Sequence, residues 1–421
     1  MSSVAAAMGG TAYGQSTTSA IRPFQFHAPE AQLSELKRRI KTTRWPERET
    51  VADDSQGIPL ATMQALAQYW AGAYDWRKCE NRLNAYPQFV TGIDGLDIHF
   101  MHIRSKHANA MPLIVTHGWP GSVLEQLKII DLLTNPTAHD ASPSDAFHLV
   151  IPSLPGYGFS AKPGKTGWGP ERTALAWVVL MKRLGYDRFA AQGGDLGSVV
   201  SQAMAVQAPP ELIGIHINFP SAVPPQILMA AQNGDPAPAG LDEEEKRAYA
   251  SLSIQFKKRR AYSAFMATRP QTLYGLADSP VGLASYLLDH GDGWGQPAAT
   301  ITSALAGHDV GGYSAGTLTR DDLLDGITLY WLTNTGVSAA RFYWESHTNL
   351  YLAPGIKTPV AVSAFPGEIY QVPRRWAETA YPNLIYYGHP DKGGHFAAWE
   401  QPELFSEEVR AGLRPLRRSS S

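Results

Sequence analysis

The chain has 421 residues, of which 44% are hydrophobic and 18% charged, a composition typical of a soluble globular protein with a large core. Its formal net charge of -2 gives no electrostatic reason to expect nucleic acid or an anionic membrane as a partner. The single cysteine, Cys79, excludes an intrachain disulfide, and no apolar run approaches the roughly 18 residues that would cross a bilayer. We therefore expect a soluble, cytoplasmic protein that binds small molecules.

The N-terminal part of the chain begins with small and polar residues. Residues 1–22 lack the basic start and the compact apolar centre of a secretory signal, so we expect a flexible tail. Apolar residues then recur at helical spacing over residues 33–40 and again over residues 59–73. This pattern predicts an N-terminal helical arm over residues 23–87, with apolar faces that need a partner.

Strand signals begin near residue 88, where two apolar runs flank a Gly-Asp-type turn at residues 93–96 and predict a hairpin. Apolar runs, glycine-rich turns and helices then alternate up to the proline pair Pro209-Pro210. Such alternation predicts a mostly parallel sheet with helices on both faces, and we assign its first part to residues 88–222.

The alternation stops after about Pro220. A charged helix is predicted over residues 241–270 and an aromatic helical segment over residues 279–290, so we expect a helical lid over residues 223–322. Two strand signals, an intervening helix and a closing helix then place the second part of the α/β core at residues 323–421.

One aspartate stands between glycines where an apolar run meets a small-residue helix. The string "GGDLGS" around Asp195 has the form of a nucleophile elbow, a tight strand-to-helix turn that exposes its central side chain above the sheet. An aspartate at this point could equally be a simple N-cap of the helix. Composition does not decide between a working carboxylate and a cap.

Two further strings are candidates for the same site. "HGWPGS", beginning at His117, follows an apolar run and can aim backbone N–H groups at an anion, although an ordinary Gly/Pro turn is the alternative. His395 follows two glycines near the C-terminus. A lone histidine is more often structural, but the order nucleophile, acid, histidine is the one that this kind of sheet uses for a catalytic triad.

The acid of such a triad must lie between the aspartate and the histidine. Glu368 in "FPGE" follows a late apolar run and therefore stands at the C-terminal end of a strand, where ligands bind in open α/β sheets. Asp391 lies too close to His395 in a tight glycine turn, and Asp325 is the other rival. We therefore expect Glu368 to be the acid.

Taken together, "GGDLGS", "HGWPGS", "PSLPGYGFS" and "GGHFAAWEQPE" resemble the epoxide hydrolases of the α/β-hydrolase superfamily. The helical arm, the "FPGE" acid and "DSPVGLASYLLD" are similar to the microsomal-type branch, and the likeness covers about residues 24–413. It implies an α/β-hydrolase fold with a helical lid and an N-terminal helical arm. Membrane-bound members carry an N-terminal anchor, and since none is recognised here we expect a soluble form, either a monomer or a homodimer.

The resemblance also implies a reaction, the hydrolysis of an epoxide to a vicinal diol. Asp195 would attack an epoxide carbon without prior activation, because a carboxylate is already ionised at neutral pH. Tyr262 and Tyr343 match the positions of the family's donors to the epoxide oxygen. Four other tyrosines are alternatives for these donors: Tyr249, Tyr274, Tyr286 and Tyr330.

The resulting ester would then be hydrolysed. His395 would take a proton from water, with Glu368 fixing the imidazole, and the backbone N–H groups of Trp119 and Leu196 would hold the oxyanion. No cofactor or metal is required. Aromatic and apolar residues in the lid favour an apolar epoxide. A haloalkane dehalogenase with an aspartate nucleophile and a catalytically silent binding protein on the same scaffold remain the alternatives.

Overall fold

The fold is described by a computed structural model that covers residues 18–289 and 298–417. Within these residues, nine strands form one sheet in the order β1-β2-β3-β5-β4-β6-β7-β8-β9. The strands are β1 (Arg22–Phe24), β2 (Gln88–Ile93), β3 (Leu96–Ile103), β4 (Met111–Thr116), β5 (Phe147–Pro152), β6 (Phe189–Gly193), β7 (Leu212–Ile217), β8 (Val360–Ser363) and β9 (Leu384–Gly388). From β5 to β9 all neighbours are parallel, which confirms the predicted mostly parallel sheet.

The antiparallel end of the sheet contains the predicted hairpin. Strands β2 and β3 pair up to Ile93 and Leu96, and the two turn residues Asp94 and Gly95 both have positive φ, as a two-residue hairpin turn requires. Strand β1, which was not predicted, adds to β2 at the edge. We predicted a flexible tail over residues 1–22, of which residues 1–17 lie outside the described part of the chain. Residue 18 is attached to the sheet, because the Thr18 carbonyl accepts a hydrogen bond from the Gly92 amide of β2.

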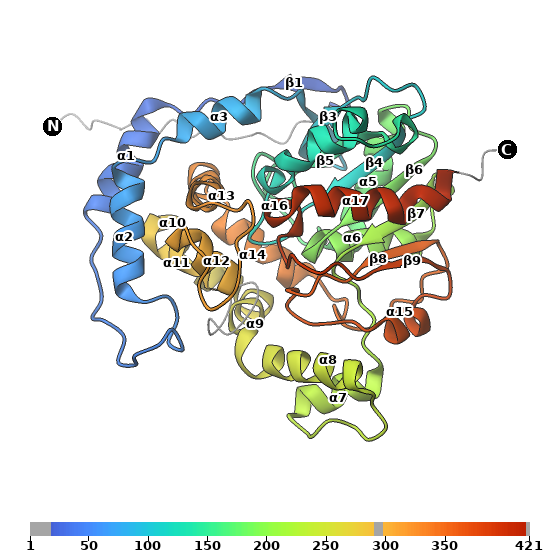
Figure 1. The fold of residues 1–421 in the computed structure, drawn as a ribbon. Helices are drawn as coiled ribbons and strands as arrows, with labels where there is room; N and C mark the ends of the chain where they lie inside the picture. Colours follow the sequence, from blue (N-terminus) through green and yellow to red (C-terminus); the bar gives the residue numbers. More distant parts are fainter. Residues whose placement is uncertain (1–17, 290–297, 418–421) are drawn as a thin grey trace.

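Helices cover both faces of the parallel strands (Figure 1). The helices of the α/β core are α4 (Ile130–Thr134), α5 (Pro170–Arg183), α6 (Asp195–Gln207), α15 (Arg374–Ala380), α16 (Ala397–Glu400) and α17 (Pro402–Leu413). Helices α5 and α6 pack together on one face, and α4 and α17 on the other. Most side chains of β4 and β6 are consequently fully buried, as expected for parallel strands.

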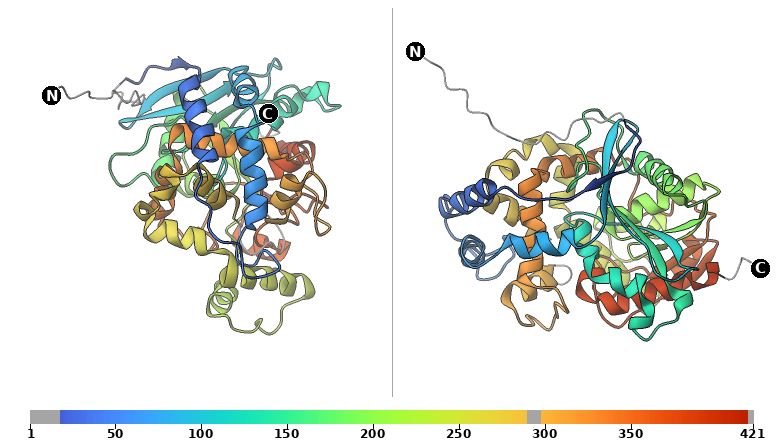
Figure 2. Two further views of the ribbon diagram at one scale, coloured as in Figure 1. Left: turned by 90° about the vertical axis from the view of Figure 1, so that its left-hand side faces the viewer. Right: turned by 90° about the horizontal axis from the view of Figure 1, so that it is seen from above.

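The helices of the N-terminal arm pack mainly on other helices, whereas β1 joins the sheet (Figures 1 and 2). Its helices are α1 (Glu30–Lys41), α2 (Leu60–Ala71) and α3 (Trp76–Asn84). Helices α1 and α2 contact each other and α11 (Pro280–Leu288), while α3 contacts α13 (Arg320–Thr333). The indole of Trp70 in α2 is buried and donates to the Thr328 hydroxyl of α13 at 3.0 Å. The arm thus finds its apolar partner in the helices beside the sheet.

The remaining helices lie over the carboxyl ends of the strands. They are α7 (Pro225–Asn233), α8 (Glu243–Ile254), α9 (Ala261–Thr268), α10 (Gly275–Asp278), α12 (Ala298–Ala306) and α14 (Gly336–Glu345). The prediction of a single charged helix over residues 241–270 is wrong, because a π-helical turn at Gln255–Arg259 separates α8 from α9. This break lets α8 pack on α7 while α9 packs on α14. The lid boundary at residue 322 stays a proposal, since α13 spans it and α14 follows it, yet both contact lid helices.

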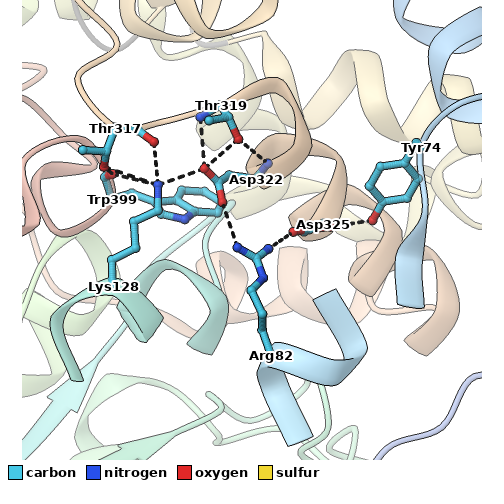
Figure 3. A network of polar contacts seen from close by, with 8 residues as sticks. All are labelled: Tyr74, Arg82, Lys128, Thr317, Thr319, Asp322, Asp325 and Trp399. Carbon is cyan, nitrogen blue, oxygen red and sulfur yellow. Dashed lines mark hydrogen bonds and ion pairs between the residues drawn. The ribbon is translucent and has the colours of Figure 1, made fainter. Parts of the chain in front are cut away.

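A polar network ties the arm to these helices (Figure 3). The Arg82 guanidinium in α3 pairs with Asp325 and lies 3.8 Å from Asp322, both in α13. Lys128 approaches from the 3₁₀ helix η1 (Val123–Ile129), and its Nζ donates to Asp322 at 2.9 Å and to the Thr317 carbonyl at 2.7 Å. The network therefore joins three elements that are far apart in the sequence.

No helix in the described part of the chain combines the length and the apolar character that crossing a membrane would require.

Candidate active site

Asp195 stands at the sharp turn between β6 and α6. Its φ is +47°, a left-handed conformation that a non-glycine residue rarely adopts. The turn is crowded: a Cβ at Gly193 would lie 2.1 Å from the Gly197 carbonyl oxygen, and one at Gly197 would lie 1.9 Å from the Thr116 carbonyl oxygen. Gly194 occupies the N-cap position of α6, so the helix-cap explanation of Asp195 is wrong. The strained turn instead presents the carboxylate at the end of β6.

Backbone amides hold the Asp195 carboxylate in place. The Trp119 amide, from the loop after β4, donates to Asp195 Oδ1 at 2.8 Å. Burial acts to raise the pKa of Asp195, but the His395 side chain and the Trp119 and Leu196 amides together outweigh it, so this pKa is lowered. The carboxyl group is therefore ionised at neutral pH, and Oδ1 already lies against an N–H donor.

The loop of Trp119 is itself fixed by a buried histidine. Nε2 of His117 accepts from the Leu154 amide at 3.2 Å, which joins the "HGWPGS" loop to the "PSLPGYGFS" loop. Burial lowers the pKa of His117 to about 4, so its imidazole is neutral and can accept this hydrogen bond. His117 thus has a structural task beside the candidate site.

His395 lies between the two carboxylates that the sequence selected. Its Nε2 is 3.4 Å from Asp195 Oδ2, and its Nδ1 is 2.5 Å from Glu368 Oε1. Burial would lower the pKa of His395, but the charges and hydrogen bonds of Glu368 and Asp195 raise it well above its usual value. The two rivals for the acid lie elsewhere, since Asp391 is exposed and Asp325 pairs with Arg82.

Two aromatic rings from the helices above the sheet cover the same carboxylate. Tyr262 of α9 stacks on Trp119 with ring centroids 4.8 Å apart, and Tyr343 of α14 meets the same indole edge-on at 6.1 Å. Burial, and then the charge of Asp195, raise the pKa of both phenols well above its usual value. Both side chains are therefore neutral hydrogen-bond donors close to Asp195.

The four alternative tyrosines are engaged or exposed elsewhere. Three of their hydroxyls donate to backbone carbonyls: Tyr249 to that of Asp235, Tyr286 to that of Tyr262, and Tyr330 to that of Gly121. The side chain of the fourth, Tyr274, is 67% exposed. The geometry thus favours Tyr262 and Tyr343 over these alternatives as the pair near the carboxylate.

Sequence reasoning missed the polar residues beneath this group. Glu125 and Gln126 of η1, Gln192 of β6 and Asn218 border a cavity of about 20 Å³ together with Asp195 and His395. The sequence shows only that a glutamate, Glu125, stands four residues after Gly121 of the "HGWPGS" loop. Nothing in the sequence itself connects this glutamate to the site. Larger cavities, such as one of about 470 Å³ between α2, α11 and α12, do not border these residues.

Among residues 18–289 and 298–417, no group of three or more His, Cys, Asp or Glu side chains is arranged to hold a metal ion.

Comparison with known proteins shows what the chain is similar to. A sequence model described as "Epoxide hydrolase N terminus" matches residues 21–126, and one described as "alpha/beta hydrolase fold" matches residues 111–272. A protein of Stigmatella aurantiaca (strain DW4/3-1) with a provisional epoxide hydrolase name is 48% identical over 94% of this chain and 86% of its own length. Epoxide hydrolase 1 of Oryctolagus cuniculus is 35% identical over 92% of this chain and 88% of its own length. The crystal structure of juvenile hormone epoxide hydrolase from the silkworm Bombyx mori superposes with a TM-score of 0.82 at 31% identity, covering 96% of each chain.

Proposed function

Because the chain belongs to the epoxide hydrolase family with the α/β-hydrolase fold, we propose that Asp195 opens the epoxide and that His395 and Glu368 hydrolyse the resulting ester. The protein is an epoxide hydrolase, and a covalent aspartyl ester is general for this family. The assignment of each step to a residue is our proposal. The observation that carries it is the position of Asp195, with Oδ1 on the Trp119 amide and Oδ2 3.4 Å from His395.

In the first step, Asp195 Oδ2 attacks an epoxide carbon and the carbon–oxygen bond of the ring breaks. The lowered pKa of Asp195 keeps the nucleophile charged, and the raised pKa values of Tyr262 and Tyr343 keep both phenols protonated. The departing oxygen becomes far more basic than a phenol as it leaves. It can therefore take a proton from one tyrosine while the other donates a hydrogen bond.

Esterification changes the charge around His395. The negative charge of Asp195 disappears, and with it one of the two carboxylates that raise the pKa of the imidazole. His395 can then return the proton that it carries to the tyrosinate left by ring opening and become a base that takes a proton from water, while Glu368 on Nδ1 keeps Nε2 directed at the reaction. Water adds to Cγ of Asp195, and the oxyanion stays on the amides of Trp119 and Leu196. The ester bond then breaks, and the diol leaves with the proton from His395. The second water proton, left on the Asp195 carboxyl group, passes to His395 and restores the charged nucleophile.

We also propose that the substrate is an apolar epoxide, because the rings of Trp119, Tyr262 and Tyr286 gather above the carboxylate. The dehalogenase alternative would need halide donors near the aspartate, commonly a tryptophan indole N–H or an Asn amide, and Trp119 stands where such a donor could lie. The relatives that resemble this chain over most of its length are instead epoxide hydrolases. No further candidate function is favoured by a specific observation.

The experiment separates the two steps. Asp195→Asn should abolish diol formation from styrene oxide, because the amide carries no charge. His395→Gln should still form the ester but fail to hydrolyse it, so intact-protein mass spectrometry should show a stable adduct of one substrate. Normal turnover without any adduct in the His395 variant would contradict the two-step assignment. A wild-type protein that leaves both a panel of epoxides and haloalkanes unchanged would favour the catalytically silent binding protein.

A further inference from the structure

A small cavity lies directly against the two residues that the proposed hydrolysis uses. It has a volume of about 20 Å³ and is bordered by Asp195 and His395, with Trp119 and the aromatic residues Phe396 and Trp399 completing part of its wall. A single water needs at least ~10 to 15 Å³ of such space, whereas an epoxide with an apolar substituent needs far more. The cavity is therefore of the size of the second reactant, water, and not of the first.

Two buried amide oxygens at this cavity have no protein donor. Gln126 and Gln192 both border it, and within the described residues neither Oε1 has a hydrogen-bond partner. Each amide nitrogen is already used, since Gln126 Nε2 donates to Glu125 at 2.8 Å and Gln192 Nε2 donates to Asn218 at 3.0 Å. An unmatched buried oxygen costs about 1 to 3 kcal/mol, so these oxygens favour a bound donor such as water.

The Glu125 carboxyl group is held rigidly at the same cavity. It fills the space beside Gly121, where a Cβ would lie 1.9 Å from Oε2, and the Gly121 carbonyl is fixed by the Tyr330 hydroxyl at 3.0 Å. The helix η1 that carries Glu125 is in turn anchored by Lys128, which joins it to Asp322 and to the carbonyl of Trp399 (Figure 3). The carboxyl group therefore has little freedom to leave the cavity.

Glu125 can hold a water without adding a second charge beside the nucleophile. Burial, and then the charge of Asp195, raise its pKa to about 8, although His395, Gln126 and the Gly118 amide act in the opposite direction. In the free enzyme at neutral pH the group is mostly protonated, and burial, the larger cause, persists when Asp195 is esterified. It then has both an O–H donor and a carbonyl acceptor to offer.

We propose that this cavity binds the water that hydrolyses the Asp195 ester, and that Glu125 orients this water against His395. The inference rests on the proposed function, because it assumes that Asp195 forms the ester. One water proton points at His395 Nε2 and the other at the unpartnered Oε1 of Gln126, while the Glu125 O–H donates to one lone pair and the other lone pair faces Cγ of Asp195. A bond forms from the water oxygen to Cγ, one water proton passes to Nε2 and then to the departing diol oxygen, and the ester bond breaks. The second water proton remains on the Asp195 carboxyl group and then passes to His395.

Two variants of similar volume test the role of Glu125 in the full-length enzyme. Glu125→Gln keeps a carbonyl acceptor and an N–H donor, whereas Glu125→Leu keeps the bulk and loses both. Rapid-quench mass spectrometry with styrene oxide gives the rate of ester formation, and diol release in single turnover gives the rate of its hydrolysis. The Leu variant should hydrolyse the ester about 10- to 100-fold more slowly at a nearly unchanged rate of formation, because the water loses its orientation. The Gln variant should recover most of that loss.

A second carboxyl group provides the matched control. Glu400 is also buried near His395, with its pKa raised by burial to about 7, but it accepts from the Phe396 amide and does not border the cavity. Glu400→Gln should leave the ratio of the two rates unchanged. If Glu125→Leu proves too unstable in thermal melts, Gln126→Leu replaces it and should also slow hydrolysis selectively.

Each outcome separates this inference from the proposed function. Wild-type hydrolysis in the Leu variant, or an equal loss of both steps, would overturn the role of Glu125. A Gln variant as slow as the Leu variant would also overturn it, because hydrogen bonding would not be the property that matters. Absence of any ester in His395→Gln would instead refute Asp195 as the nucleophile, whatever the Glu125 variants do.

Discussion

The close approach of Gly118 to the nucleophile allows a sharp prediction. A Cβ at this position would lie 2.3 Å from both Cβ and Oδ1 of Asp195, whereas ordinary contact begins at 3.4 Å. In Gly118→Ala the carboxylate must therefore move by about 1 Å, and Oδ1 would leave the Trp119 amide, which now donates at 2.8 Å. A displacement of that size costs about 100-fold in rate, which corresponds to about 2.7 kcal/mol of transition-state stabilisation.

Steady-state kcat/KM for styrene oxide and the single-turnover rate of ester formation measure this loss. Gly275→Ala is the control, since a Cβ at Gly275 meets nothing within 4 Å and the residue lies on the lid helix α10. Thermal melting of both variants establishes that the fold is retained. A folded Gly118→Ala enzyme that forms the ester about as fast as the wild type would refute the view that Asp195 must stay against the Trp119 amide.

The other predictions concern ring opening and acid stability. Tyr343→Phe should slow ester formation about 10- to 100-fold, and the double variant with Tyr262→Phe should slow it far more; unchanged rates of ester formation in the double variant would remove both phenols from the mechanism. Burial lowers the pKa of His216 from 6.5 to about 3, so the unfolded chain binds more protons between these values and stability falls as pH decreases. Between about pH 7 and 5, the free energy of unfolding measured in urea should therefore fall by about 2 kcal/mol less in His216→Gln than in the wild type. An equal fall in both proteins would show that His216 is not responsible.

The sheet was predictable wherever local sequence and tertiary role agree. Strand β6, the elbow at Asp195 and helix α6 follow one another as an apolar run, glycines and small residues, and each of these signals has a local cause. Strand β7 was missed because Leu212–Ile217 lies between prolines, with Gly214 and His216 breaking its apolar run. Only its pairing with β6 and β8 identifies it as a central strand.

The helices beside the sheet show a second limit. Helix α3 carries four charged residues among nine, so its buried side, which includes Trp76 and Leu83, stands out poorly in the sequence. Helix α13 is buried on nearly all sides by the arm and the lid, and therefore lacks the one-sided apolar pattern that marks a surface helix. Both helices depend on partners that are remote in the chain.

In the candidate site, too, the residues with a local sequence signal were predictable and those placed by remote contacts were not. Chain order was enough to select Asp195, Glu368 and His395, because the elbow and the strand ends constrain where such side chains can meet. Glu125 could not be selected in this way. Its place beside the cavity depends on the absence of a side chain at Gly121, a contact that appears only when η1 folds back against the loop.

The network around Arg82 also has a consequence for how the chain is assembled during synthesis. Arg82 and Tyr74 contact Asp325 across 243 and 251 residues, and Trp70 reaches Thr328 across 258. The arm leaves the ribosome first, yet its buried partners follow only after more than half of the chain has been translated. Docking of the arm is therefore a late event, and the apolar faces of its helices stay open to chaperones or to other nascent chains until α13 emerges.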